Sequence, residues 1–74
     1  MWSTGSIKTG KSEFQYWVKH YEEGSIFGIN EGRISKLTLK RDGRITANYD
    51  REWDIEAADA DTKTALARLL KKYN

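Results

Sequence analysis

Two segments in which polar and apolar residues alternate, 33–41 and 44–50, flank the dipeptide Asp42-Gly43. Alternation with a period of two is typical of a β-strand that buries one face. Asp-Gly favours the positive φ angles of a two-residue type I′ turn. The pattern therefore predicts a β-hairpin. The residues expected on its inward face are Ser35, Leu37, Leu39, Ile45, Ala47 and Tyr49.

A different periodicity marks residues 63–73, where apolar side chains recur at intervals of three and four residues. This spacing places them on one side of an α-helix. Asp59 and Asp61 precede the segment and Lys71-Lys72 lie near its end, as the helix dipole favours. We expect a C-terminal amphipathic helix whose apolar side packs on a sheet.

The segment 12–21 fits either a strand or a helix. Read with a period of two, its apolar face carries Phe14, Tyr16 and Val18. Read with a period of 3.6, the apolar face carries Phe14, Trp17, Val18 and Tyr21. Aromatic and β-branched residues favour the strand, and Glu22-Glu23 would oppose the dipole at the end of a helix. We therefore prefer a strand, preceded by a first short strand from Trp2 to Lys8.

Together these elements predict an α+β fold, an antiparallel β-meander of about four strands with one C-terminal amphipathic helix packed on one face. No proline, repeat or low-complexity run divides the chain, so residues 1–74 are expected to form a single small domain. The glycine-rich segment 24–32 is expected to be a hinged loop. The residues of this loop expected to cover an open side of the core are Ile26, Phe27 and Ile29.

The octapeptide Gly5-Ser6-Ile7-Lys8-Thr9-Gly10-Lys11-Ser12 fits the phosphate-binding pattern G-x-x-x-x-G-K-[ST]. A working phosphate loop follows a buried strand and opens a helix, and a separate strand ends in a magnesium-binding Asp. Only four residues precede Gly5, and 74 residues cannot supply a parallel sheet covered by helices on both faces. We therefore interpret the octapeptide as strand end, turn and strand start, an interpretation that a helix at 12–21 would weaken.

Two further features could carry chemistry, an acidic ladder and a single histidine. The ladder, in which carboxylates would share one side of an extended segment, consists of Asp50, Glu52, Asp54 and Glu56. Alternate residues of a strand lie about 7 Å apart, which is too wide for several carboxylates to converge on one cation, so we expect no metal site. His20 has no cysteine partner and no activated serine is apparent. We expect no catalytic residue, no cofactor and no enzymatic activity.

The opposite face of the predicted sheet combines aromatic and basic side chains. Its candidate binding residues are Trp17, Lys19, Tyr21, Lys36, Lys40 and Arg44, with Ile34 expected on the same face. Surfaces of this kind bind single-stranded nucleic acid by stacking bases on rings and attracting phosphates. The alternative is that Trp2, Trp53 or the glycine loop covers Trp17 and Tyr21, and the sequence leaves this question open.

Net charge and composition narrow the possible functions only slightly. Thirteen Lys and Arg against eleven Asp and Glu give a net charge of +2, which permits nucleic-acid binding without requiring it. The absence of cysteine fits a reducing compartment. No basic segment followed by an apolar run begins the chain, so we expect no signal peptide, no membrane association and a cytoplasmic location.

Three runs of residues carry a resemblance: Gly28-Ile29-Asn30, then Gly32-Arg33-Ile34-Ser35-Lys36-Leu37, then Asn48-Tyr49-Asp50-Arg51 with Trp53-Asp54. They resemble a family of short uncharacterised proteins encoded on conjugative elements, plasmids and phages of Gram-positive bacteria. The resemblance implies a compact β-rich accessory protein of mobile DNA. We expect a non-catalytic protein-binding module with an unidentified protein partner, present as a monomer or weak homodimer. The alternative is a single-stranded nucleic-acid binder that uses the aromatic and basic face.

Overall fold

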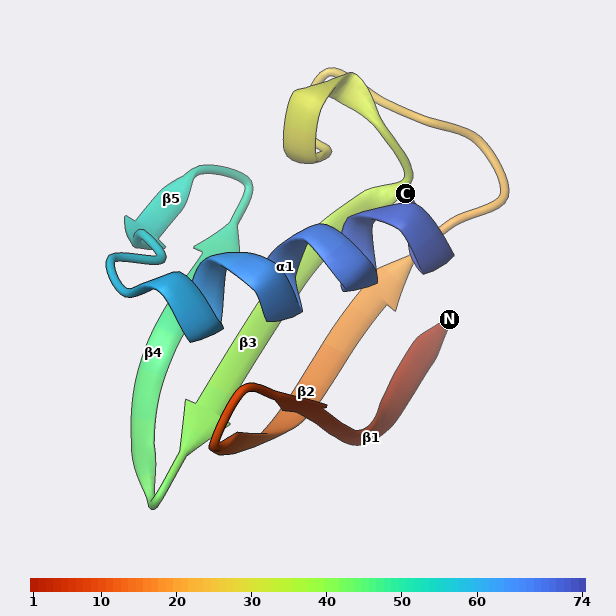
Figure 1. Ribbon diagram of the computed structural model, residues 1–74. Coiled ribbons are helices and arrows are strands. Elements are labelled where there is room, and N and C mark those ends of the chain that lie inside the picture. The colour runs from red at the N-terminus through yellow and green to blue at the C-terminus, as the bar shows by residue number, and fades with distance from the viewer.

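The computed structural model describes residues 1–74 and consists of one antiparallel sheet crossed by one α-helix (Figure 1). The elements are β1 (Trp2–Thr9), β2 (Ser12–His20), the short 3-10 helix η1 (Ile29–Glu31), β3 (Ile34–Arg41), β4 (Arg44–Asp50), β5 (Trp53–Ile55) and α1 (Ala60–Tyr73). Each strand pairs with its neighbour in sequence, in the order β1-β2-β3-β4-β5. The predicted α+β fold is therefore confirmed, and a short fifth strand extends the meander of about four.

Both tight hairpin turns use backbone conformations that few residues adopt. Asp42 has a φ of 52° and Gly43 a φ of 79°, as the predicted type I′ turn requires. In the turn between β1 and β2, Gly10 has a φ of 58°. Because Ser12–His20 is a strand, the interpretation of this segment as a strand is confirmed and the octapeptide lacks the helix of a phosphate loop.

The turn between β1 and β2 is instead fastened to the start of α1. The Thr9 hydroxyl donates a hydrogen bond to the Asp61 carbonyl at 2.8 Å, and the Ser12 hydroxyl donates to the Asp61 carboxylate at 2.7 Å. A Cβ on Gly10 would lie 2.6 Å from Asp61 Oδ1, so glycine lets the turn approach the helix. These residues of the octapeptide thus join the hairpin to α1.

The core lies between α1 and the side of the sheet that α1 crosses (Figure 1). Its buried side chains are Phe14, Tyr16, Val18, Ile29, Ile34, Leu37, Leu39, Ala47, Tyr49, Ala65 and Leu69. The other side of the sheet is called the open face below.

α1 is neither long enough nor apolar enough to cross a membrane.

The loop before β3 contributes less to the core than its sequence predicts. Ile29 is buried, and its carbonyl accepts a hydrogen bond from the Asn74 side-chain amide at 3.0 Å. Ile26 and Phe27 are exposed, so the expectation that they cover the core is wrong. Steric closeness explains why this loop is rich in glycine, since a Cβ on Gly28 would overlap the Gly32 carbonyl.

A bulge at Ser35 moves Ile34 to the side of the sheet that faces α1. Lys19 pairs with Lys36 but His20 pairs with Ile34, which leaves Ser35 without a partner. One extra residue reverses the facing of everything beyond it. Ile34 is therefore completely buried, and its predicted place on the open face is wrong.

A second bulge, at Thr46, reverses the start of β4. Leu39 pairs with Ala47 but Lys40 pairs with Ile45, so Thr46 has no partner in β3. Ile45 consequently leaves the core for the open face, where it is 48% exposed. The prediction that Ile45 faces inward is therefore wrong.

The same bulge moves Arg44 off the open face. The register pairs Arg44 with Arg41, and directly paired residues point to the same side of a sheet. The Arg41 guanidinium lies 5.2 Å from the Phe14 ring centroid, on the α1 side. The prediction that Arg44 lies on the same face as Trp17 and Lys40 is therefore wrong.

Asp59 caps α1 and also ties the helix to β3. Its carboxylate accepts hydrogen bonds from the Thr62 amide and hydroxyl, both at 2.8 Å, and from Arg41 Nη1 and Nη2, both at 3.1 Å. The hydrogen bonds from Arg41, followed by those from Thr62, hold the pKa of Asp59 far below its ordinary value of 3.8. The charged form of Asp59 therefore stabilises the fold.

The free energy of unfolding is expected to fall as the pH drops below about 4, because unfolded Asp59 then binds protons that folded Asp59 does not. Its contribution is fully present above the unfolded pKa of 3.8 and is lost as the pH falls towards the lower folded pKa. Asp59→Asn keeps a capping oxygen but carries no charge. We expect urea unfolding, followed by tryptophan fluorescence, to show a less stable variant at pH 7 with a flatter acid dependence. Equal acid dependence in both proteins would contradict this role.

Candidate functional site

The open face is not covered by any other element of the chain (Figure 1). Three of its aromatic side chains reach solvent, with exposed fractions of 38% for Trp17, 49% for Tyr21 and 55% for Trp2. Trp53 lies on the α1 side, where its ring centroid is 5.1 Å from that of Tyr49. The question that the sequence leaves open is thus resolved in favour of an exposed face.

The strand register arranges the open face in rows that cross β1 to β4. The central row consists of Thr4, Trp17, Thr38 and Asn48. The row on one side of it consists of Trp2, Lys19, Lys36 and Asp50. The row on its other side consists of Ser6, Gln15, Lys40 and Ile45. Diagonal neighbours in such rows lie within reach of long side chains. Trp17 is therefore adjoined by three lysines.

Lys19 lies between two of the exposed rings. Its ammonium nitrogen is 5.9 Å from the Trp2 ring centroid and 5.8 Å from the Tyr21 ring centroid, within the range of cation–π contacts. The residues that the open face brings together are named the aromatic–lysine cluster. They are Trp2, Trp17, Lys19, Tyr21, Lys36 and Lys40.

Trp2 is the member of the cluster that sequence reasoning missed as a binding residue. The signal was present, because pairing Thr9 with Ser12 across the two-residue turn places Trp2 opposite Lys19. Alternation then assigns Trp2 to the same face as Lys19.

One carboxylate forms a salt bridge with a lysine of the cluster. Lys36 Nζ lies 3.8 Å from an Asp50 carboxylate oxygen, and both side chains are well exposed. Exposed pairs of this kind contribute little free energy. Lys19 and Lys40 form no salt bridge. All three ammonium groups can therefore reach an anion above the sheet.

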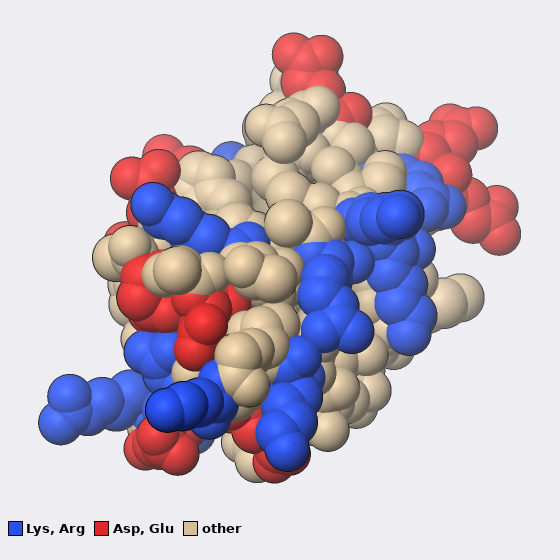
Figure 2. Space-filling view, in the orientation of Figure 1, with Lys and Arg blue, Asp and Glu red and all other residues tan.

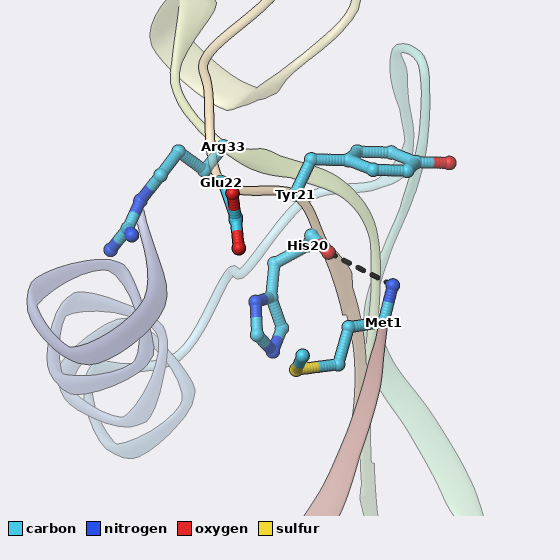
Figure 3. Close-up of a pocket in the computed structure, with 5 residues that line it drawn as sticks. All are labelled: Met1, His20, Tyr21, Glu22 and Arg33. Atoms are coloured by element: carbon cyan, nitrogen blue, oxygen red, sulfur yellow. Dashed lines mark hydrogen bonds between the residues drawn. The ribbon is translucent and has the colours of Figure 1, made fainter.

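A pocket of about 340 Å³ opens at the end of the cluster beyond Tyr21 (Figure 3). It is lined by Met1, His20, Tyr21, Glu22 and Arg33. Tyr21 and Arg33 extend in opposite directions, and the Glu22 carboxylate lies on the same side as Arg33 and His20 (Figure 3). Glu22 offsets the positive charge of this pocket, so its chemistry indicates no single class of ligand.

A family model described as a domain of unknown function (DUF7678) matches residues 1–74. The chain belongs to this family. Neither a curated protein nor a solved structure matches this DUF7678 member.

His20 in this DUF7678 member has a structural environment. It is the last residue of β2, and its Nε2 atom shares a hydrogen bond of 2.9 Å with the Ser3 hydroxyl. Its ring centroid lies 4.9 Å from that of Tyr73. Burial lowers the pKa of His20 below its usual range, and the positive charges of the chain N-terminus and Arg33 add to the effect. Neutral His20 thus packs the end of α1 against β1 and β2.

The four acids of residues 50–56 do not form the continuous ladder that alternation predicts. β4 ends at Asp50, Arg51 adopts a φ of 66°, and β5 begins at Trp53. The chain therefore reverses in the middle of the acidic segment. No three His, Asp or Glu side chains of the DUF7678 chain gather closely enough to hold a metal ion.

Proposed function

We propose that this protein is a non-catalytic binder of single-stranded nucleic acid and that the aromatic–lysine cluster is its contact surface. The observation that supports the proposal best is Trp17, exposed on an uncovered face and adjoined by Lys19, Lys36 and Lys40. Bases of any sequence stack on exposed rings, while ammonium groups attract the phosphates that join them.

The spacing of the rings suits a strand of nucleotides. Trp17 and Tyr21 are four residues apart, which corresponds to about 13 Å in an extended chain. Two rings at that separation contact different bases. Lys19 lies between them, where it can approach the intervening backbone.

The lysines favour nucleic acid over a protein as the ligand of this face. The centres of protein–protein interfaces are depleted in lysine, because its ammonium is strongly hydrated and costly to bury. A phosphate backbone instead gains affinity from each lysine by releasing bound counterions. Three lysines beside one exposed tryptophan therefore suit nucleic acid better than they suit a protein ligand.

Binding of a labelled oligothymidylate should weaken with salt. Three phosphate contacts predict a slope of about −2 in a plot of log K against log salt concentration, at about −0.7 per contact on single strands. Lys40→Ala is expected to make the slope less steep by about 0.7. Fluorescence anisotropy across a salt series measures both values.

Lys63→Ala is the matched control for this experiment, because Lys63 is an exposed lysine at the other side of the molecule, on α1. Its slope should equal that of the unmodified protein. Absence of binding at low salt, or an equal change in both variants, would count against the proposal.

A second candidate function is a protein-binding module, which the sequence resemblance favours. The observation that supports it lies away from the cluster, where Ile26 and Phe27 are exposed in the loop before η1. Exposed apolar side chains that adjoin one another are typical of interaction sites. Retention of a partner protein by the unmodified chain, lost in Phe27→Ala and kept in Trp17→Ala, would favour this function.

The proposal includes a biological setting. The protein is an accessory protein of a mobile element in Gram-positive bacteria, acts in the cytoplasm and is a monomer or weak homodimer. Support comes from the resemblance carried by residues 28–30, 32–37, 48–51 and 53–54 and from the cysteine-free composition.

A further inference from the structure

A second pocket lies on the α1 side of the sheet, in the groove between α1 and the outer strand β1. Its volume is about 170 Å³, and it is lined by Ser6, Ile7, Tyr16, Arg68, Leu69 and Lys72. A water molecule occupies about 30 Å³ in the liquid, so the groove has room for an ion of several heavy atoms.

Two cations without acidic partners line this groove. Arg68 and Lys72 are four residues apart on α1, which places them on the same side of the helix one turn apart. Neither forms a salt bridge. Like charges at this spacing repel each other, so a bound anion would relieve an unfavourable contact.

The surroundings of the groove are also basic. Residues 62–74 contain four Lys and Arg side chains and no Asp or Glu side chain. Figure 2 views this side and shows basic side chains gathered over the C-terminal half of α1 and the neighbouring part of β1, with acidic side chains mostly outside that region. The local field therefore attracts anions.

The free edge of β1 supplies a neutral donor. Met1 and His20 exchange two backbone hydrogen bonds, of 2.9 Å and 3.1 Å. Antiparallel pairing alternates between hydrogen-bonded and non-hydrogen-bonded pairs, so the N–H groups of Trp2, Thr4 and Ser6 point away from β2. The Ser6 N–H therefore lies at the edge that lines the groove.

Arg68 is held in position at the same edge. Its Nη1 atom donates a hydrogen bond of 2.8 Å to the Lys8 carbonyl, which points outward for the same reason. A guanidinium has five N–H donors in a fixed fork, so most of them stay available. A planar fork, a lysine and a backbone N–H together suit the oxygens of a phosphate group.

We propose that the groove between β1 and α1 binds a phosphate group, through Arg68, Lys72 and the Ser6 amide. This site is separate from the aromatic–lysine cluster, which occupies the other side of the sheet. The phosphate belongs either to a small molecule or to a nucleic-acid backbone, and both sources offer the same oxygens to the three donors.

The test is a titration with inorganic phosphate, followed by the amide signals of the ¹⁵N-labelled protein, against sodium chloride of equal ionic strength. The Ser6 signal is expected to shift in a saturable manner with phosphate and not with chloride. Arg68→Ala should abolish the saturable shift, whereas Arg68→Lys, which keeps the charge but not the fork, should weaken it. Lys63→Ala and Trp17→Ala should leave it unchanged.

An unmoved Ser6 signal would overturn the proposal, as would an equal loss in Lys63→Ala, which would indicate only a general charge effect. The Trp17→Ala background weakens binding of an oligothymidylate at the aromatic–lysine cluster, and loss of the Ser6 shift in Arg68→Ala assigns the signal to the groove. In that background, displacement of inorganic phosphate by an oligothymidylate assigns the site to a nucleic-acid backbone. Displacement by a mononucleotide but not by the oligothymidylate assigns it to a small molecule.

Discussion

Replacing Trp17 with alanine is expected to weaken the binding of a labelled oligothymidylate by about fivefold to 150-fold, equivalent to about 1 to 3 kcal/mol. The reason is that Trp17 is an exposed ring adjoined by Lys19, Lys36 and Lys40, so its loss removes the central stacking surface of the proposed contact site. Fluorescence anisotropy at one low salt concentration measures the affinity. The fold should be unaffected, because Trp17 lies outside the core.

Two variants sharpen this experiment. Phe27→Ala removes another exposed aromatic ring, outside the open face, and should leave the affinity unchanged. Trp17→Phe keeps a smaller ring and should retain part of the affinity. If Phe27→Ala weakened binding as much as Trp17→Ala, general hydrophobic contact would explain the result better than the cluster does.

The largest effect on stability is expected from Leu39→Ala. Leu39 is completely buried between the sheet and α1, and removing a buried leucine side chain costs about 2 to 5 kcal/mol of unfolding free energy. A domain of this length has about 4 to 11 kcal/mol in total, at roughly 0.05 to 0.15 kcal/mol per residue. The variant should therefore lose a large share of its stability, measured by urea unfolding with fluorescence and circular dichroism.

Ile45→Ala is the matched control, since Ile45 is an aliphatic residue in the paired strand that alternation also assigns to the core. The bulge at Thr46 places it on the open face instead. We expect a loss below about 1 kcal/mol, because a half-exposed side chain leaves little cavity behind. A loss as large as that of Leu39→Ala would contradict the bulge.

Local sequence signals predict the hairpin of β3 and β4 and the helix α1. Asp42-Gly43 specifies the turn of this hairpin, because both residues adopt the positive φ angles of a type I′ turn. The helix α1 is predicted by the periodicity of apolar residues over 63–73. Both signals involve residues that are near one another in the chain. No distant contact is needed to read them.

The bulges could not be predicted in the same way. Serine and threonine are ordinary residues in strands, and neither residue type shows that Ser35 and Thr46 lack a partner in the neighbouring strand. Each bulge reverses the facing of the residues beyond it. Alternation therefore assigns Ile34, Arg44 and Ile45 to the wrong sides. It assigns Lys36 and Lys40, which lie between the two bulges, and Trp17 and Lys19, which lie on β2, to the correct side.

The fifth strand and the exposure of the candidate site depend on tertiary structure. β5 has only three residues and follows a turn in which Arg51, not glycine, has a positive φ. Whether Trp17 is exposed depends on where distant segments pack, and its exposed fraction of 38% is a property of the folded chain. Propensity and periodicity carry no information on such placements.

The meander also determines how the chain assembles. Every strand pairs with the strand next to it in sequence, so the sheet can grow through successive short-range hairpins. α1 is different, because its hydrogen bonds from Thr9 and Ser12 to Asp61 join residues 52 and 49 positions apart. Closing such long loops costs chain entropy, whereas the contact of Arg41 with Asp59 spans only 18 positions, so we expect the attachment of the β1–β2 turn to α1 to form late in folding.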